Sequence, residues 1–96
     1  MGVEDIQKTL TENRAELSAM RIRSLSVFGS MARNTAHSGS DIDLLVEFEE
    51  PVGLFHFARV RRRLSEMLGR PVDLTTSAAL REELRGSILK EAIHAA

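Results

Sequence analysis

A short apolar run that begins with two carboxylates, residues 41–48, constrains this chain more than any other segment. The run reads DIDLLVEF and ends shortly before Pro51. Because side chains alternate along a β-strand, Asp41 and Asp43 point to one face and Ile42 to the other. Two carboxylates on one face repel each other and lose solvation unless a cation compensates, and magnesium prefers such oxygens while leaving room for phosphate and water. The alternative is a pair of acids at a solvated strand end.

A glycine and a hydroxyl follow an earlier apolar segment. The sequence VFGS at residues 27–30 predicts a strand that enters a tight turn, followed by a short helix over residues 30–34 with Ser30 as its N-cap. Gly29 permits close backbone approach, and free N–H groups at such a turn suit a phosphate. Arg33 follows on the same helical face and can reach anionic oxygens. The alternative is an ordinary N-cap with a surface arginine.

A third acid stands in another short apolar segment, Pro71-Val72-Asp73-Leu74. An acid between apolar residues in a strand is unusual unless it faces water or a metal. Three carboxylates can hold two metal ions about 3.5–4 Å apart, which stabilises the attacking and leaving oxygens of an in-line displacement at phosphorus. Asp73 is then the natural metal ligand or base for activating an acceptor hydroxyl.

Apolar periodicity predicts alternating helices and strands along the rest of the chain. A stripe of residues Leu54, Phe57, Val60 or Arg61, Leu64 and Leu68 indicates a helix that Gly69 ends. The order of elements predicts an α/β domain of helices layered on a small sheet. The expected elements are a helix over 4–20, a strand over 24–28, the short helix over 30–34, a loop over 37–40, a strand over 41–48, a helix over 53–68, a strand over 71–75 and a helix over 77–92.

Size and charge narrow the class of protein. Ninety-six residues predict a single domain over residues 1–96. The net charge of −1 gives no electrostatic case for direct nucleic-acid binding, and no apolar run approaches the roughly 20 residues that a membrane span needs. The chain has no cysteine, which excludes disulfides and thiolate metal sites. We therefore expect a cytoplasmic protein.

The combined motifs resemble a known family. VFGS at 27–30 with Arg33, SDIDL at 40–44 and VDL at 72–74 are similar to the DNA polymerase β-type nucleotidyltransferase superfamily. The resemblance covers nearly the whole chain and is closest to the minimal nucleotidyltransferases that act as antitoxins beside HEPN toxins. It implies the polymerase β-like fold, with helices packed on a small mixed sheet.

The resemblance also implies a role for each motif residue. Gly29 and Ser30 would hold the triphosphate of ATP, and Arg33 would add an auxiliary phosphate contact. Asp41 and Asp43 would bind two Mg²⁺ ions. Asp73 would complete the metal and catalytic site and assist the acceptor hydroxyl.

By the same resemblance, the reaction would transfer AMP from ATP to a hydroxyl, a tyrosine of a cognate HEPN toxin, and so silence the toxin. Larger relatives carry an added helical domain that this chain lacks, which favours a macromolecular acceptor whose surface completes the pocket. Two alternatives stay open. One is a binding-only antitoxin that occludes its partner. The other is an adenylyltransferase for a small molecule such as an aminoglycoside, which would need an oligomer or a partner.

Several residues fall outside these motifs. Five arginines form a basic cluster that is either a solvated helix face or a surface for an acidic partner or a nucleic-acid-bound complex. Helical spacing cannot bury all three apolar residues at 54, 55 and 57 in one core, so one of them is a candidate for a protein interface. The histidines have no metal-ligand spacing and are expected to be structural or exposed. These residues are Arg59, Arg61, Arg62, Arg63 and Arg70, Leu54, Phe55 and Phe57, and His37, His56 and His94.

Overall fold

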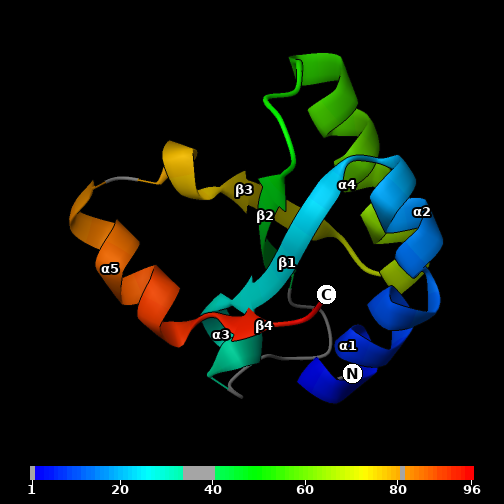
Figure 1. The fold of residues 1–96 in the computed structure, drawn as a ribbon. Coiled ribbons are helices and arrows are strands. Elements are labelled where there is room, and N and C mark those ends of the chain that lie inside the picture. The colour runs from blue at the N-terminus through cyan, green and yellow to red at the C-terminus, as the bar shows by residue number, and fades with distance from the viewer. Residues whose placement is uncertain (1, 34–40, 81) are drawn as a thin grey trace.

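A four-stranded mixed sheet organises the computed structural model, which describes residues 2–33, 41–80 and 82–96 (Figure 1). The strand order is β3-β2-β1-β4. The central strands β1 and β2 pair antiparallel, β2 and β3 pair parallel, and β4 pairs antiparallel with the outer edge of β1. The strands are β1 (Ile22–Phe28), β2 (Ile42–Phe48), β3 (Val72–Thr76) and β4 (Ile93–His94). The predicted class, helices packed on a small mixed sheet, is confirmed.

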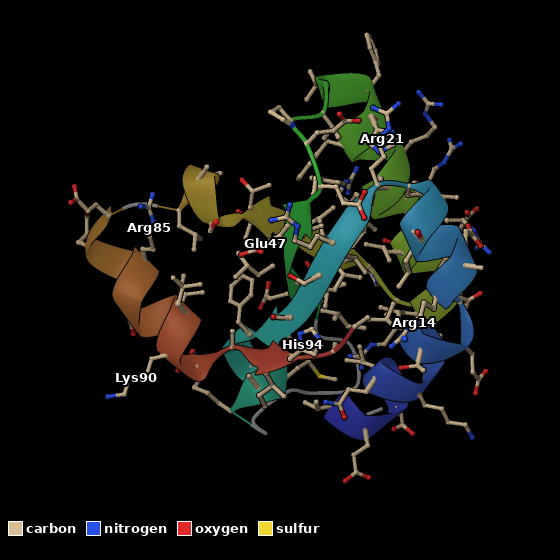
Figure 2. The ribbon with its side chains drawn as sticks, viewed as in Figure 1. Arg14, Arg21, Glu47, Arg85, Lys90 and His94 are labelled. Atoms are coloured by element: carbon tan, nitrogen blue, oxygen red, sulfur yellow. The ribbon has the colours of Figure 1, made fainter. Side chains whose placement is uncertain are left out.

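Helices cover one face of the sheet, and a single helix stands at its other side (Figure 1). Helices α1, α2 and α4 lie together on the first side of the sheet, whereas α5 lies on the opposite side. The helices are α1 (Val3–Glu12), α2 (Arg14–Ala19), the four-residue α3 (Gly29–Ala32), α4 (Leu54–Leu68), the 3₁₀ turn η1 (Ser77–Ala79) and α5 (Glu82–Glu91). Charged side chains project outward from them, for example Arg14 from α2 and Lys90 from α5 (Figure 2).

The core lies between the sheet and the three helices of the first side. Alternate residues of β1 and β2 are fully or nearly fully buried there, and they meet the inner faces of α1 and α4. Burying an aliphatic side chain of this size stabilises the fold by about 1.5–3 kcal/mol. The central members are Ile6, Leu10, Leu25, Val27, Ile42, Leu44, Val46, Val60 and Leu64. Since Ile42 and Leu44 point into this core, Asp43 between them points to the opposite face of the sheet.

Two predicted helices are each divided in the structure. The helix expected over 4–20 is interrupted at Asn13, whose side-chain amide donates a 2.8 Å hydrogen bond to the carbonyl of Thr9 and competes with the helix ladder. The helix expected over 77–92 begins as η1, and Leu80 is extended, with φ −74° and ψ 141°, before α5. The loop predicted over 37–40 and His37 lie outside the described residues.

The sequence pattern did not predict β4 at all. Its two residues pair with Ser26 and Val27, and the backbone then continues the contact, because the amides of Ala95 and Ala96 both donate to the carbonyl of Leu25. A two-residue strand carries no periodicity, so only the pairing itself reveals it.

Helix α4 is well delimited by glycines. Gly53 is its N-cap, and Gly69 ends it in the left-handed conformation with φ 69°, as predicted. The buried stripe contains Val60 rather than Arg61, and Leu54, which was assigned to that stripe, is 79% exposed. Leu54 is the first residue of the helix and lies outside the core, whereas Phe57 in the same turn packs against it.

The histidines of the described segments are structural or exposed, as expected. His56 lies in α4, and its Nε2 is 2.8 Å from the carbonyl oxygen of Met20 while its ring packs edge-on against Phe48. His94 is exposed in β4. Among the described helices, none combines the length and the apolar character that crossing a bilayer requires.

The left-handed Gly69 provides a first prediction. Replacing it with alanine should lower the free energy of unfolding by about 1 kcal/mol, because a Cβ is disfavoured at positive φ, although the space around it is open. Chemical denaturation monitored by circular dichroism measures this. The matched control is Gly86→Ala, inside α5, without a left-handed φ and also in open space, which should instead raise stability by up to about 1 kcal/mol because glycine is a poor helix former. Equal losses in both variants would contradict the conformational explanation.

Candidate active site

Two of the three predicted acids lie side by side in the sheet. The parallel pairing of β2 with β3 sets Asp43 opposite Asp73, in the same register as Ile42 with Val72. Side chains at one register position of neighbouring strands point to the same face, so both carboxylates leave the sheet on the side away from the core. Asp43 is half-buried and Asp73 is exposed, and the two carboxyls are close enough to interact.

The electrostatics of this pair indicate an excess of negative charge. Burial raises the pKa of the Asp43 carboxyl above its ordinary value, the charges of Asp73 and Asp41 raise it further, and so does the hydrogen bond with Asp73. Arg33 opposes these effects and lowers the pKa. Asp41 itself is exposed and lies just before the first residue of β2. The predicted acids therefore act on one another, with Asp43 at their centre.

Gly29 is in direct contact with this centre. It follows Phe28, which pairs with Asp43 across the antiparallel strands β1 and β2. Its φ of 69° is left-handed, and a Cβ at this position would lie 2.2 Å from Oδ2 of Asp43. Glycine is thus required twice, once by the backbone conformation and once by the carboxylate that occupies the space of a side chain. The turn predicted from the GS pair is present.

The start of the short helix differs from the prediction. Helix α3 begins at Gly29 with Phe28 in the N-cap position, so Ser30 lies inside the first turn and is not the N-cap. The left-handed Gly29 brings the helix start forward by one residue. Ser30 is half-buried in this turn, next to the glycine that touches Asp43.

Arg33 connects the turn to α5. It is the C-cap residue that follows α3, and its Nη1 lies 3.3 and 3.2 Å from the two carboxylate oxygens of Glu91. Its effect on the pKa of Asp43 shows that the guanidinium also acts on the acid pair. Sequence reasoning placed Arg33 near anionic groups but missed Glu91, because the contact joins segments 58 positions apart in the chain.

The donor set fits a magnesium ion chemically, although no preformed cage is present. In residues 2–33, 41–80 and 82–96, no group of three acidic or histidine side chains converges in metal-binding geometry. Magnesium is commonly held by one or two carboxylates, with substrate phosphates and water completing its shell. Two carboxylates in contact, one with a raised pKa, offer such a partial site.

Comparison with known proteins defines the family. The family described as nucleotidyltransferase domain matches residues 6–94. Protein adenylyltransferase MntA of Thermococcus cleftensis is 34% identical over 95 residues, which cover 98% of this chain and 96% of that protein. The chain therefore belongs to the nucleotidyltransferase domain family. It is a nucleotidyltransferase, a class of enzyme that acts on a nucleotide substrate.

Two solved structures support this assignment at the level of the fold. One, described as a proposed minimal nucleotidyltransferase, has a TM-score of 0.81 and 35% identity, with 97% of this chain and 95% of that chain covered. A chain from the complex of a tri-AMPylated Shewanella oneidensis HEPN toxin with an MNT antitoxin has a TM-score of 0.68 at 16% identity, covering 95% and 71%. The resemblance to minimal nucleotidyltransferases is confirmed.

The contact between Gly29 and Asp43 gives a second prediction. Gly29→Ala should destabilise the protein by about 2–4 kcal/mol, since it combines a left-handed Cβ with overpacking against the carboxylate. Gly69→Ala, with the same φ but open surroundings, isolates the conformational part. In an Asp43→Ala background the extra cost should largely disappear, because the carboxylate is gone. Denaturation curves of the four variants test this, and an undiminished cost in that background would contradict the steric contact.

The raised pKa of Asp43 gives a third prediction, about stability and pH. A carboxyl with a higher pKa in the folded than in the unfolded state binds more protons when folded, so its contribution to stability falls as pH rises through that range. Asp43→Asn should therefore be more stable than the natural protein at pH 7 without metal, by at most about 1 kcal/mol because the pair is partly solvated.

The pH dependence separates this effect from a packing change. The stability difference between Asp43→Asn and the natural protein should shrink as the pH falls toward about 4, the ordinary pKa of an aspartate. The measurement is urea denaturation between pH 3 and pH 8. Glu47→Gln, an exposed acid on the same face of β2, is the control and should show no such trend. A difference independent of pH would argue against charge repulsion.

Proposed function

We propose that this chain transfers AMP from ATP to a hydroxyl of a partner protein, a tyrosine of a HEPN-type toxin, and thereby acts as an antitoxin. The observation that carries the proposal is the Asp43–Asp73 pair beside Gly29. The same reaction is supported by the match to protein adenylyltransferase MntA, which covers 98% of this chain. The solved complex of an MNT antitoxin with an AMPylated HEPN toxin supports the choice of partner.

The reaction is a displacement at the α-phosphorus of ATP. The acceptor oxygen forms a new bond to that phosphorus, the bridging P–O bond to the β-phosphate breaks, and pyrophosphate leaves. The proton of the acceptor hydroxyl passes to a carboxylate, for which exposed Asp73 is the best placed. The products are an AMP–protein ester and pyrophosphate.

The remaining site residues position the triphosphate. The turn at Gly29 and Ser30 would approach the phosphates through its backbone, since no side chain at residue 29 stands in the way. Arg33 would offset the negative charge, as it already does for Asp43. Asp41, Asp43 and Asp73 would hold Mg²⁺, with two ions expected, and the metal would supply charge neutralisation at the phosphates.

An acid pair that faces away from the core leaves the acceptor side open. Asp73 is exposed, and α5 reaches this region through the Arg33–Glu91 ion pair. A macromolecular acceptor can provide the missing wall of the pocket with its own surface. We place the reaction in the cytoplasm, where ATP and an intracellular toxin would meet.

Intact-mass spectrometry tests this function. The HEPN-type protein encoded beside this chain is incubated with the chain, ATP and Mg²⁺, and its mass should rise by one or more AMP units. Asp43→Asn should lose at least about a hundredfold in rate, because it removes a charge that the transferring phosphate needs. The matched control Glu47→Gln, on the same face of β2, should keep the rate.

The variants also separate the alternatives. If the partner stays unmodified but is still neutralised by both the natural chain and Asp43→Asn, the chain acts by occlusion alone. If the partner is unmodified and a small hydroxylated compound gains AMP instead, the acceptor assignment is wrong. Omission of Mg²⁺ should abolish transfer, and full activity in the presence of a chelator would contradict the metal requirement.

A further inference from the structure

The outer face of α4 carries large apolar side chains that the core does not use. Leu54 is 79% and Phe55 is 85% exposed, although the same helix buries Val60 and Leu64 completely on its inner face. An exposed phenylalanine at the first turn of a helix contributes nothing to core packing. Single exposed apolar residues are common, so the neighbours of Phe55 decide whether it has a role.

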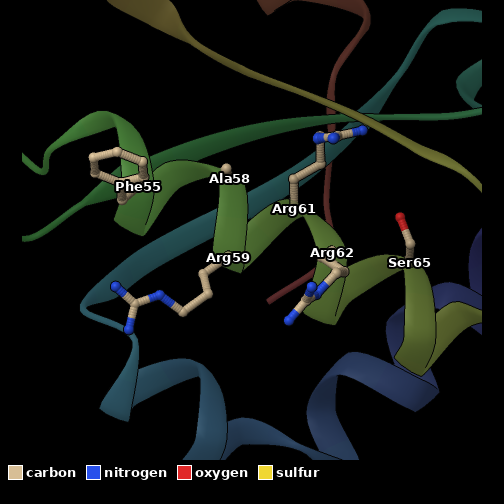
Figure 3. Close-up of a pocket in the computed structure, with 6 residues that line it drawn as sticks. All are labelled: Phe55, Ala58, Arg59, Arg61, Arg62 and Ser65. Carbon is tan, nitrogen blue, oxygen red and sulfur yellow. The ribbon is translucent and has the colours of Figure 1, made fainter.

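Those neighbours are arginines at helical spacing. Phe55, Ala58, Arg59 and Arg62 recur at intervals of three or four and so form one stripe, here called the outer stripe. Together with Arg61 and Ser65 they line a hollow on the helix surface. Figure 3 shows Arg59 and Arg62 leaving the helix on one side and Arg61 on the other, with the Phe55 ring toward the beginning of the helix.

The arginines that line this hollow make no ion pair within the described part of the fold. Arg59, Arg61 and Arg62 are exposed, and none has an acidic partner among the described residues. Arg63 in the same helix is different, because its Nη2 donates a 3.0 Å hydrogen bond to Oε1 of Glu16 on α2. Of the five arginines in the basic cluster predicted from the sequence, Arg63 is thus paired within the fold, Arg70 lies beyond the end of α4, and the other three are exposed cations on the helix.

The outer stripe is separate from the acid pair. The inner face of α4 packs on the side of the sheet that holds Ile42 and Leu44, whereas Asp43 points to the other side. No residue of the stripe can therefore reach a nucleotide held at Gly29. The exposed phenylalanine and arginines of the stripe therefore have a role other than nucleotide transfer.

We propose that the outer stripe docks an acidic amphipathic helix of the acceptor protein, so that binding and chemistry occur on different faces of the domain. The inference rests on the proposed function in taking the acceptor to be a HEPN-type protein. Aromatic and arginine side chains are the residues enriched at the energetic centres of protein interfaces. From Phe55 to Arg62 the stripe rises about 10 Å, which matches two turns of a partner helix.

Charge complementarity favours a protein over a nucleic acid. The chain as a whole carries a net charge of −1, and Glu49, Glu50 and Glu66 flank the stripe along the sequence. A chain that binds nucleic acid usually has a broad excess of positive charge, which this chain lacks, whereas a short acidic helix needs only the local group of arginines. Phe55 would insert among apolar residues of that helix, and its burial would strengthen the arginine contacts.

A docking face remote from the chemistry has a kinetic signature. Weakening it should raise the KM for the acceptor protein, while the rate at saturating acceptor stays close to that of the natural chain, because the acids are untouched. Binding should also weaken with rising salt, since exposed arginines supply much of the attraction.

Binding and kinetics of three variants test the proposal. The charge reversal Arg59→Glu/Arg62→Glu and the single change Phe55→Ser should each weaken the Kd for the HEPN-type protein about tenfold or more, measured by calorimetry without ATP. The matched control is Lys8→Glu/Arg14→Glu, which makes the same change of charge at exposed positions of α1 and α2 and should bind like the natural chain. Circular dichroism confirms that each variant is folded.

The possible outcomes are distinct. Unchanged affinity in both stripe variants, or equal loss in the control, would overturn the docking surface. So would conversion of a natural dimer to monomers by the stripe variants, or loss of binding to a single-stranded oligoribonucleotide, since these would assign the stripe to a second copy or to RNA. Stripe-dependent binding without any AMP transfer would uphold the docking surface and refute the proposed function. AMP transfer with a KM that the stripe variants leave unaltered would support the proposed function and refute the docking surface. Absence of both binding and transfer would refute both proposals.

Discussion

The fold depends on a close contact between a glycine and a carboxylate. The space that any other residue at position 29 would fill is occupied by Oδ2 of Asp43, and the left-handed turn of Gly29 is what allows β1 to end there. The antiparallel register of β1 with β2 and the parallel register of β2 with β3 then fix the acids relative to the turn. The same three strands that bury the core on one side therefore bring the residues of the candidate site together on the other.

This arrangement brings like charges together at Asp43, and the buried core of the domain offsets the energetic cost. Asp43 has like charges on two sides, and its half-buried position makes them more costly than they would be in water. The neighbouring residues Ile42 and Leu44 are completely buried on the opposite face and anchor the strand. The core therefore offsets the cost of keeping two carboxyls together, a cost that arises from burial and like charge. Strain of this kind is typical of functional sites.

The sequence predicted those features that depend on local pattern. The apolar runs of the three longer strands, the stripe of α4 and the glycine that ends it at Gly69 are set by periodicity and backbone preference, and all were found. The meeting of Asp43 with Asp73 followed from the family motifs, but its cause, a parallel pairing in register, has no local signal. Two local features differ from the prediction. The helix breaks at Asn13, where a side-chain hydrogen bond competes with the helix ladder, and the short helix begins at Gly29, which is left-handed. The Arg33–Glu91 pair could not be foreseen, because it joins distant segments.

The short β4 strand has a consequence for solubility. β1 is rich in apolar residues. On its side away from β2, the described residues pair with it at Ser26 and Val27 and through the carbonyl and amide of Leu25, which bond to Ala95 and Ala96. An unpaired strand edge is a template on which other chains add and aggregate. A few residues without periodicity or bulk thus cover part of the β1 side of the sheet, whereas β3 forms the opposite edge. Their contribution lies less in the energy of folding than in keeping separate molecules apart.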